Sequence, residues 1–288
     1  MHPACTDADY RSDAAALLLA STHPGADLPD VNINYPSTYS ALAVYNILGY
    51  NGQSHRPGEY PSEVAYNWKE HATLRWKDVR NSWKPVDATT ASIGLLTMYL
   101  SQLLLSLGEV RELVIMSGAH PCGHEYNFYG YNATATAHVV NTWPQPMTFS
   151  GTELGEMVYS GARLTGEGPA HDPVNAAYRW YNGYNATHYP WDPLTVLYAI
   201  EDLGDTFEFG TDGVYNYIYL YGRNEWQSCG IASASFQHYL KLAIPGEALG
   251  AILDEAYLQG ARMAAQHDKQ WQNKCIYCKV GLVFNKET

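Results

Sequence analysis

Short β-branched or apolar segments alternate with helix-like segments along this chain, and this alternation constrains the fold more than any other feature. Residues 31–34 (VNIN) have the alternating, β-branched character of a strand, and a helical pattern follows at 37–48. Residues 112–116 (ELVIM) form another short apolar segment. Strands that alternate with helices form βαβ units. We therefore predict an α/β fold with a doubly wound, mostly parallel sheet flanked by helices, in which ligands bind at the carboxyl ends of the strands.

The other segments extend this pattern. We predict helices at 14–21, 62–74, 95–107, 134–141, 171–181, 192–200 and 246–270, and strands at 88–93 and 146–150. Tyrosines at alternate positions predict a hairpin over 212–226. Ser12 or Asp13 is expected to cap the first helix, and Asp192, followed by Pro193, is expected to cap a later one.

Composition limits the size of the fold and the kind of partner. With 288 residues, 46% of them hydrophobic and 16% charged, the chain can fill the core of one large domain, which we predict over residues 1–288. The net charge of -12 argues against nucleic acid or an anionic membrane surface as a partner, because both require clustered Lys and Arg. No segment approaches the roughly 20 unbroken apolar residues of a transmembrane helix. A small neutral ligand or a metal cation fits better.

The localisation signals point in two directions. The start MHPACTDADY lacks the basic segment and apolar run of a signal peptide, so the protein is either cytoplasmic or secreted after removal of a leader. Asn132 and Asn185 begin N-x-T sequons, which are glycosylated only in a secretory pathway. These sequons, with 24 Tyr, 8 Trp and few Lys, favour a secreted, extracellular protein. The tyrosine content also suits interfaces of a homo-oligomer or a larger self-assembly.

The cysteines do not form a recognisable framework. Five are present, at Cys5, Cys122, Cys229, Cys275 and Cys278. This number is too small for a disulfide scaffold, and it is odd, so at least one lacks a partner within the chain. Cys275 and Cys278 form a C-x-x-C pair without the second pair of a zinc site. A local or terminal disulfide is our first interpretation, and inert thiols or a redox or metal role stay open.

Two groups of polar residues could carry chemistry. Asp7, Asp9 and Asp13 lie within seven residues, before a helix, where an N-capping acidic loop is the simplest interpretation. Glu125 and Asn127 would point the same way on an extended strand, although such a pair is also ordinary loop polarity. Carboxylate and amide oxygens bind hard cations and sugar hydroxyls, so both groups fit a sugar or calcium site.

These groups occur together with 31–34, 92–97 (SIGLLT), 110–118 (VRELVIMSG) and 191–193 (WDP). In this order and spacing they resemble the nucleoside hydrolase family, which comprises calcium enzymes that cut the N-glycosidic bond of ribonucleosides. Segments 149–155 and 191–198 resemble the fungal-type branch of these inosine-uridine preferring enzymes. The resemblance extends over roughly 7–240. It implies that a calcium-bound water releases ribose and free base from a small-molecule nucleoside.

The resemblance also implies roles for individual residues. Asp9 would be the general base and a calcium ligand. The Thr97 carbonyl and Asp192 would be the other calcium ligands. The residues implied to contact the substrate are Asp13, Asn34, Glu125, Asn127 and Trp191.

The chain departs from the family pattern at several of these positions. Ala14 stands where the family has a fourth acid that is a major calcium ligand, and Met98 replaces an Asn. A one-residue shift would put Asp13 in that ligand's place but would leave the third acid missing. Trp191 replaces a His thought to assist the leaving base, and indole cannot transfer a proton near neutral pH. Possible substitutes for this His are His120, His124 and His188.

Two alternatives to an active hydrolase follow from these departures. One is a catalytically inactive nucleoside hydrolase-like protein with a secreted structural, self-assembling or binding role, since a sound scaffold can outlast its site. The other is a lectin-like module that binds sugar without cutting it.

Overall fold

The computed structural model describes residues 10–26, 47–52, 112–130, 132–210, 214–228 and 236–274. The larger sheet has the strand order β1-β3-β7-β4, with β1 at Leu113–Met116, β3 at Met147–Ser150, β7 at Gln237–Leu242 and β4 at Phe207–Phe209. β1, β3 and β7 are parallel, and β4 pairs antiparallel with β7. The register places Met116 beside Ser150, so the loops that follow β1 and β3 begin at the same edge of the sheet.

A smaller antiparallel sheet has the order β2-β6-β5. Its strands are β2 (Cys122–Gly123), β6 (Asn224–Ser228) and β5 (Val214–Ile218). β5 and β6 pair from Val214 with Ser228 to Ile218 with Asn224. This pairing confirms the hairpin predicted over 212–226.

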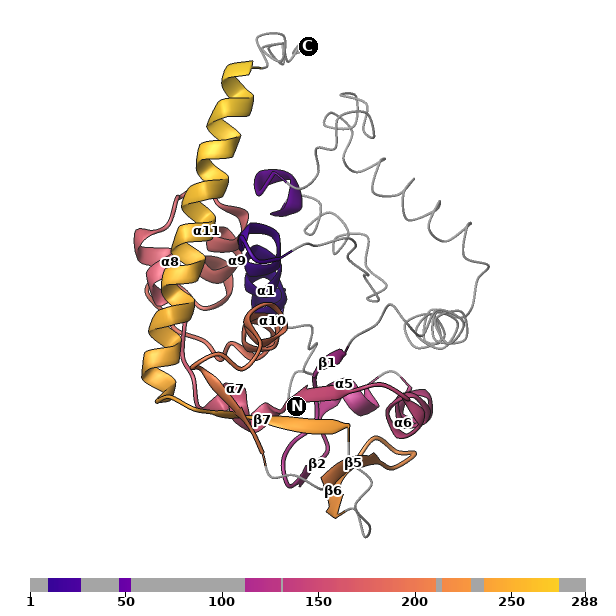
Figure 1. Ribbon diagram of the computed structural model, residues 1–288. Helices are drawn as coiled ribbons and strands as arrows, with labels where there is room; N and C mark the ends of the chain where they lie inside the picture. Colours follow the sequence, from indigo (N-terminus) through magenta and orange to yellow (C-terminus); the bar gives the residue numbers. More distant parts are fainter. Residues whose placement is uncertain are drawn as a thin grey trace, which may run out of the picture.

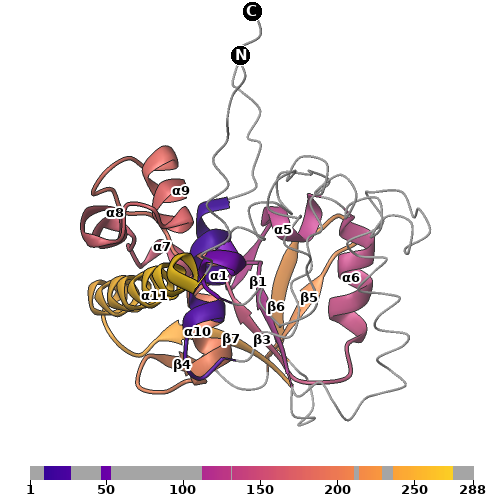
Figure 2. The same ribbon diagram turned by 90° about the horizontal axis from the view of Figure 1, so that it is seen from above.

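Helices cover both faces of the larger sheet (Figures 1 and 2). One face carries α1 (Tyr10–Thr22), α7 (Thr152–Glu156), α8 (Ala162–Glu167), α9 (Pro173–Tyr181), α10 (Trp191–Glu201) and α11 (Gly246–Lys274). The other carries α5 (Tyr126–Tyr129), α6 (Ala133–Thr142) and the smaller sheet. The predicted α/β fold, with a mostly parallel sheet flanked by helices, is thereby confirmed.

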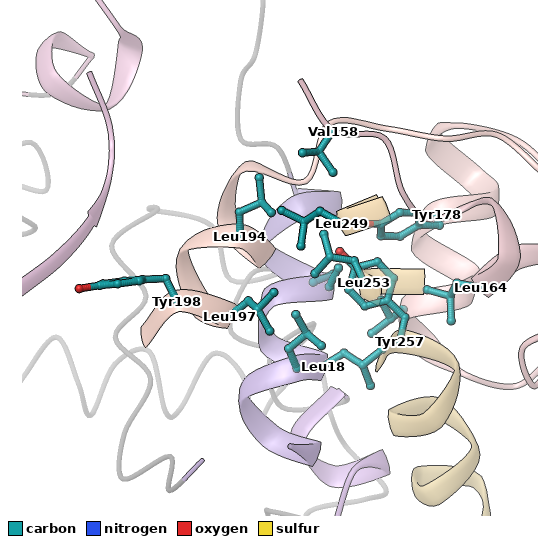
Figure 3. Packing of buried hydrophobic residues seen from close by; sticks show 14 of the residues in the cluster. Leu18, Val158, Leu164, Tyr178, Leu194, Leu197, Tyr198, Leu249, Leu253 and Tyr257 are labelled. Carbon is teal, nitrogen blue, oxygen red and sulfur yellow. The ribbon is translucent and has the colours of Figure 1, made fainter. Parts of the chain in front are cut away.

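The larger apolar core joins α1, α10 and α11 (Figure 3). Leu18 of α1, Leu194 of α10 and Leu253 of α11 are completely buried. Burial of each such side chain stabilises the fold by roughly 1.5–3 kcal/mol. The core therefore fixes the start of α10, where Trp191 and Asp192 lie.

Most local predictions within the described residues are confirmed. The helices predicted at 14–21, 134–141, 171–181, 192–200 and 246–270 correspond to α1, α6, α9, α10 and α11, and the strands predicted at 112–116 and 146–150 correspond to β1 and β3. Residues 47–48, at the end of the helix predicted at 37–48, are helical. The elements predicted at 31–34, 62–74, 88–93 and 95–107 lie outside the described residues.

Both predicted helix caps are wrong. Helix α1 begins at Tyr10, so Ser12 and Asp13 lie within it, Asp13 in the first turn. Helix α10 begins at Trp191 with Pro190 at its N-cap, and Asp192 lies in the first turn. A carboxylate there still interacts favourably with the helix dipole, although it does not cap the helix.

The structure tests two further predictions only in part, those on membrane-spanning helices and on the cysteines. Within the described ranges, no helix combines the length and apolar character needed to cross a membrane. Cys122 carries an exposed free thiol, and the other four cysteines lie outside the described residues. The single domain over residues 1–288 stays a prediction.

Candidate functional site

The loops that follow β1 and β3 are tied together at the carboxyl edge of the larger sheet. The Gly118 carbonyl oxygen accepts hydrogen bonds from Thr152 N at 2.9 Å and from Thr152 Oγ1 at 3.0 Å. Gly118 has a φ of 76°, and a side chain there would collide with Phe128. Glycine is therefore needed to turn the chain at the end of β1.

Glu125 lies beside this turn and is held through one carboxylate oxygen. Its Oε2 accepts hydrogen bonds from Ser117 Oγ at 2.7 Å, from Asn127 N at 3.0 Å and from Gly118 N at 3.4 Å. Among the described residues, Oε1 has no hydrogen-bond partner. The carboxylate is thus fixed in position while one oxygen remains able to accept from a ligand.

Asn127 contacts the end of β1. Its Nδ2 donates to the Met116 carbonyl oxygen at 3.3 Å and lies 3.2 Å from Met116 Sδ. Of the two interpretations left open for this pair, the extended strand is not observed: Glu125 is the N-cap of α5, and Asn127 lies in the first turn of that helix. A cap and a first-turn residue still bring both side chains to the end of β1.

Trp191 contacts the loop after β3. Its Nε1 donates to the Thr152 carbonyl oxygen at 3.0 Å, and its indole fills the space that a side chain at Gly155 would occupy. The rings of His188 and Tyr189 lie 5.6 Å and 5.1 Å from that of Trp191. Thr152 therefore connects Trp191 with the turn that holds Glu125.

The other predicted site residues are placed less completely. Asp192 follows Trp191 in α10 and is partly buried, and Asp13 is exposed in the first turn of α1, which packs on α10. Asp9, Asn34 and Thr97 lie outside the described residues. The structure thus brings Glu125, Asn127 and Trp191 to one edge of the sheet.

Solved structures with a similar fold include nucleoside hydrolases. A plant nucleoside hydrolase aligns over 86% of this chain and 96% of its own with a TM-score of 0.54 at 16% identity. An inosine-guanosine nucleoside hydrolase gives 0.50 at 14% identity, and the inosine-uridine preferring enzyme from Bacillus anthracis gives 0.51 at 13%, each covering 89% of this chain and 96% of its own. No protein-family model and no curated protein matches the chain. The chain has a nucleoside hydrolase-like fold.

The described part of the site does not by itself form a metal centre. Of the three ligands implied by the resemblance, only Asp192 lies within the described ranges, and these ranges contain no group of three or more His, Cys, Asp or Glu able to hold an ion. Ala14, at the position of the family's fourth acid, is buried in the apolar core with Leu18 and Leu194. A carboxylate at position 14 would be costly to bury there.

Sequence reasoning missed the amides that support the Gly118 turn. Asn224 Oδ1 accepts from Ala119 N at 3.1 Å, and Asn224 Nδ2 donates to the Ala119 carbonyl oxygen at 2.8 Å and to Asn216 Oδ1 at 2.9 Å. Both Asn side chains are almost completely buried. The signal that could have identified them is an Asn at an inward-facing position of each hairpin strand.

Glu153 was also not grouped with the site, and His120 was considered only as a substitute for the His that Trp191 replaces. Burial raises the pKa of Glu153, although main-chain N–H groups of Glu153 and His120 offset part of this effect. His120 stacks on Tyr239 with ring centroids 3.8 Å apart. Burial, and to a lesser degree the charge of Lys241, lowers the pKa of His120, so its ring is neutral near pH 7.

The two sequons occupy different environments. Asn132 is the N-cap of α6, and its Oδ1 accepts from Ala135 N at 3.0 Å. Asn185 is exposed in a turn with a φ of 55°, and its main-chain N donates to Thr165 Oγ1 at 2.9 Å. Asn185 is therefore the more accessible acceptor for a glycan.

Proposed function

We propose that this protein hydrolyses the N-glycosidic bond of ribonucleosides to ribose and free base. The observation that carries this function is the Glu125 carboxylate, which is immobilised through Oε2 and leaves Oε1 open at the carboxyl edge of the sheet. Ligands of open α/β sheets bind at this edge. The similarity to solved nucleoside hydrolases supports the same reaction class.

The proposed roles follow the resemblance seen in the sequence. Glu125 and Asn127 would hold ribose hydroxyls, together with Asp13 and Asn34. Asp9 would take a proton from the attacking water. A carboxylate and an amide that are already positioned reduce the entropy lost when the sugar is aligned for attack at C1′. Trp191 would contact the base through its indole, as aromatic rings stack on flat ligands.

Calcium belongs to this proposal as the expected cofactor. Asp9, the Thr97 carbonyl and Asp192 would hold it, and a bound hard cation would make the attacking water more acidic. Asp192 is the only one of these groups within the described residues, and the proposed roles of Glu125, Asn127 and Trp191 do not depend on the ion.

Release of free base from inosine, guanosine, uridine and cytidine, followed by chromatography, tests the function. Wild type is expected to release base from at least one of them. Glu125→Gln should lower kcat/KM about 100-fold, the scale expected when one positioned group is lost. Glu156→Gln, which changes an exposed Glu on α7, is the matched control and should retain full activity. No release by wild type with calcium added would refute the proposal.

A second candidate function is a non-catalytic scaffold that binds ribose or assembles with itself. It is favoured by Ala14, which places a buried apolar residue where the family has a calcium ligand. Exposed aromatic side chains also suit an interface, since Trp180 is 84% exposed and Tyr184 63%. Ribose that raises the Tm without any turnover, or a large assembly in size-exclusion chromatography, would support this candidate.

A further inference from the structure

The carboxyl group of Glu153 lies at the end of β3 without a function in the site described so far. Glu153 is the second residue of α7, and its carboxyl group folds back over the α-carbon of Gly151. A side chain at Gly151 would collide with both carboxyl oxygens. The glycine therefore makes room for this acid at the carboxyl edge of the sheet.

One oxygen of this carboxyl group lacks a protein partner. Glu153 Oε2 is buried and has no hydrogen-bond partner among the described residues. An unpaired buried carboxyl oxygen costs stability and calls for an explanation. Burial raises the pKa of Glu153, so this carboxyl group keeps its proton to a higher pH than an exposed Glu would, and a protonated carboxyl group is a hydrogen-bond donor.

Glu153 also follows the residue that organises the site. Thr152 accepts the hydrogen bond from Trp191 and donates two to Gly118, whose own N–H is directed to Glu125. Thr152 thus links Trp191, the proposed contact to the base, with Glu125, the proposed contact to ribose. Glu153 is the next residue in the sequence.

Two of the three histidines suggested by the sequence make contacts away from Trp191. His120 stacks on Tyr239. His124 stacks on Tyr129 at 4.1 Å, and its Nε2 lies 3.1 Å from the Tyr221 carbonyl oxygen. Of the three, His188 is the one whose ring lies beside Trp191, at 5.6 Å, so it is the rival to Glu153.

We infer that Glu153 is the proton donor to the leaving base, the role that the family gives to the His replaced here by Trp191. This inference rests on the proposed function. As the C1′–N bond breaks, its electron pair moves to the base nitrogen, which takes the proton of Glu153. The water oxygen bonds to C1′, and the water's proton passes to the general base. The general base then gives this proton up to solvent and solvent returns one to Glu153, so both groups are restored and the net reaction consumes one water.

Two substrates that differ in their need for a proton test this role. Wild type should hydrolyse inosine and para-nitrophenyl riboside, whose phenolate leaves without protonation. Glu153→Gln should lose about 100-fold or more of kcat on inosine, within the range of acid catalysis, and keep the nitrophenyl riboside rate within about threefold. Glu247→Gln is the control, because Glu247 is exposed in the first turn of α11 and does not contribute to the pKa of Glu153, and it should be normal on both substrates.

A second test uses the wild-type protein alone, so it does not depend on whether a variant folds. Its kcat on inosine should fall at high pH, as Glu153 loses its proton, while kcat on the nitrophenyl riboside should lack this decrease. An equal loss on both substrates in Glu153→Gln, or an inosine-selective loss in His188→Gln instead, would overturn the assignment. Wild type that hydrolyses neither substrate would show that the proposed function itself has failed.

Discussion

Thr152 donates two hydrogen bonds to one oxygen, the carbonyl of Gly118, through its main-chain N at 2.9 Å and its Oγ1 at 3.0 Å. This contact joins the loops that follow two parallel strands, and it does so directly beside the residues proposed to hold ribose and base. The position of Glu125 relative to Trp191 therefore depends on one threonine.

Replacing Thr152 by Val should destabilise the protein by about 1 kcal/mol, because the hydroxyl bond is lost while the main-chain bond remains. Thr152→Ser keeps a hydroxyl and is the matched control. Urea unfolding measures the difference between the two variants. If Val and Ser variants unfold at the same urea concentration, the side-chain bond does not contribute.

Asp172 caps α9 from a completely buried position, and Asp172→Ala should lower the free energy of unfolding by about 1–2 kcal/mol. Its Oδ1 accepts from Val174 N at 2.7 Å and from Asn175 N at 2.9 Å. Asp172→Asn keeps this oxygen and should retain most of the stability. Thermal unfolding of both variants checks this, and equal losses in Ala and Asn would contradict the cap.

Elements with a clear local pattern could be predicted from the sequence. The strand at 146–150 is flanked by Pro and Gly and is fully buried from Met147 to Ser150, and α11 is rich in Ala and Leu. Strand β7 escaped prediction because His238 and Lys241 interrupt its apolar pattern. Tertiary contacts accommodate both: His238 stacks on Phe209, and Lys241 pairs with Glu208 at 2.7 Å.

The candidate site was predictable only where family motifs stand in the sequence. Glu125, Asn127 and Trp191 were identified in this way, but the four-residue helix α5 is too short to show a helical period. Helix α7 was missed because glycines at both ends of its sequence suggest a loop. Gly155 is needed there for the Trp191 indole, a reason that only the packing reveals.

Compared with an Asn at the same position, Asp254 should stabilise the protein more at acidic pH than at neutral pH. It is 8% exposed, its Oδ1 accepts from Gly161 N at 2.5 Å, and burial raises its pKa. Since the folded state holds this proton more tightly than the unfolded state, the associated stability is present below the unfolded pKa of about 3.9 and is lost as the pH rises through the folded pKa.

Asp254→Asn removes this titration. The free energy of unfolding of wild type minus that of Asp254→Asn should therefore decrease as the pH rises from about 4, as measured by urea unfolding at several pH values. A difference that increases with pH would mean that the folded state favours the carboxylate, contrary to the burial argument.

Asn185 should carry a glycan when the chain passes through a eukaryotic secretory pathway, because it is exposed in a turn. Asn185→Gln should then remove the mass of one glycan, and Asn132→Gln should leave the glycan mass unchanged while destabilising α6 by about 1 kcal/mol through loss of its cap. Mass spectrometry of the intact protein distinguishes the sites. A glycan on Asn132 would overturn this assignment.

Calcium should raise the Tm of wild type if Asp9, the Thr97 carbonyl and Asp192 bind it, since a ligand of the folded state stabilises by RT ln(1 + [L]/Kd). At a calcium concentration about 100 times Kd this amounts to about 2.7 kcal/mol. Asp192→Asn removes one charged ligand and should abolish most of the shift, whereas Asp205→Asn, at an exposed loop residue, should preserve it. Differential scanning calorimetry with calcium and with EDTA measures both. A wild type without any calcium-dependent shift would mean that the ligand set is incomplete, as Ala14 suggests, and would favour the non-catalytic scaffold.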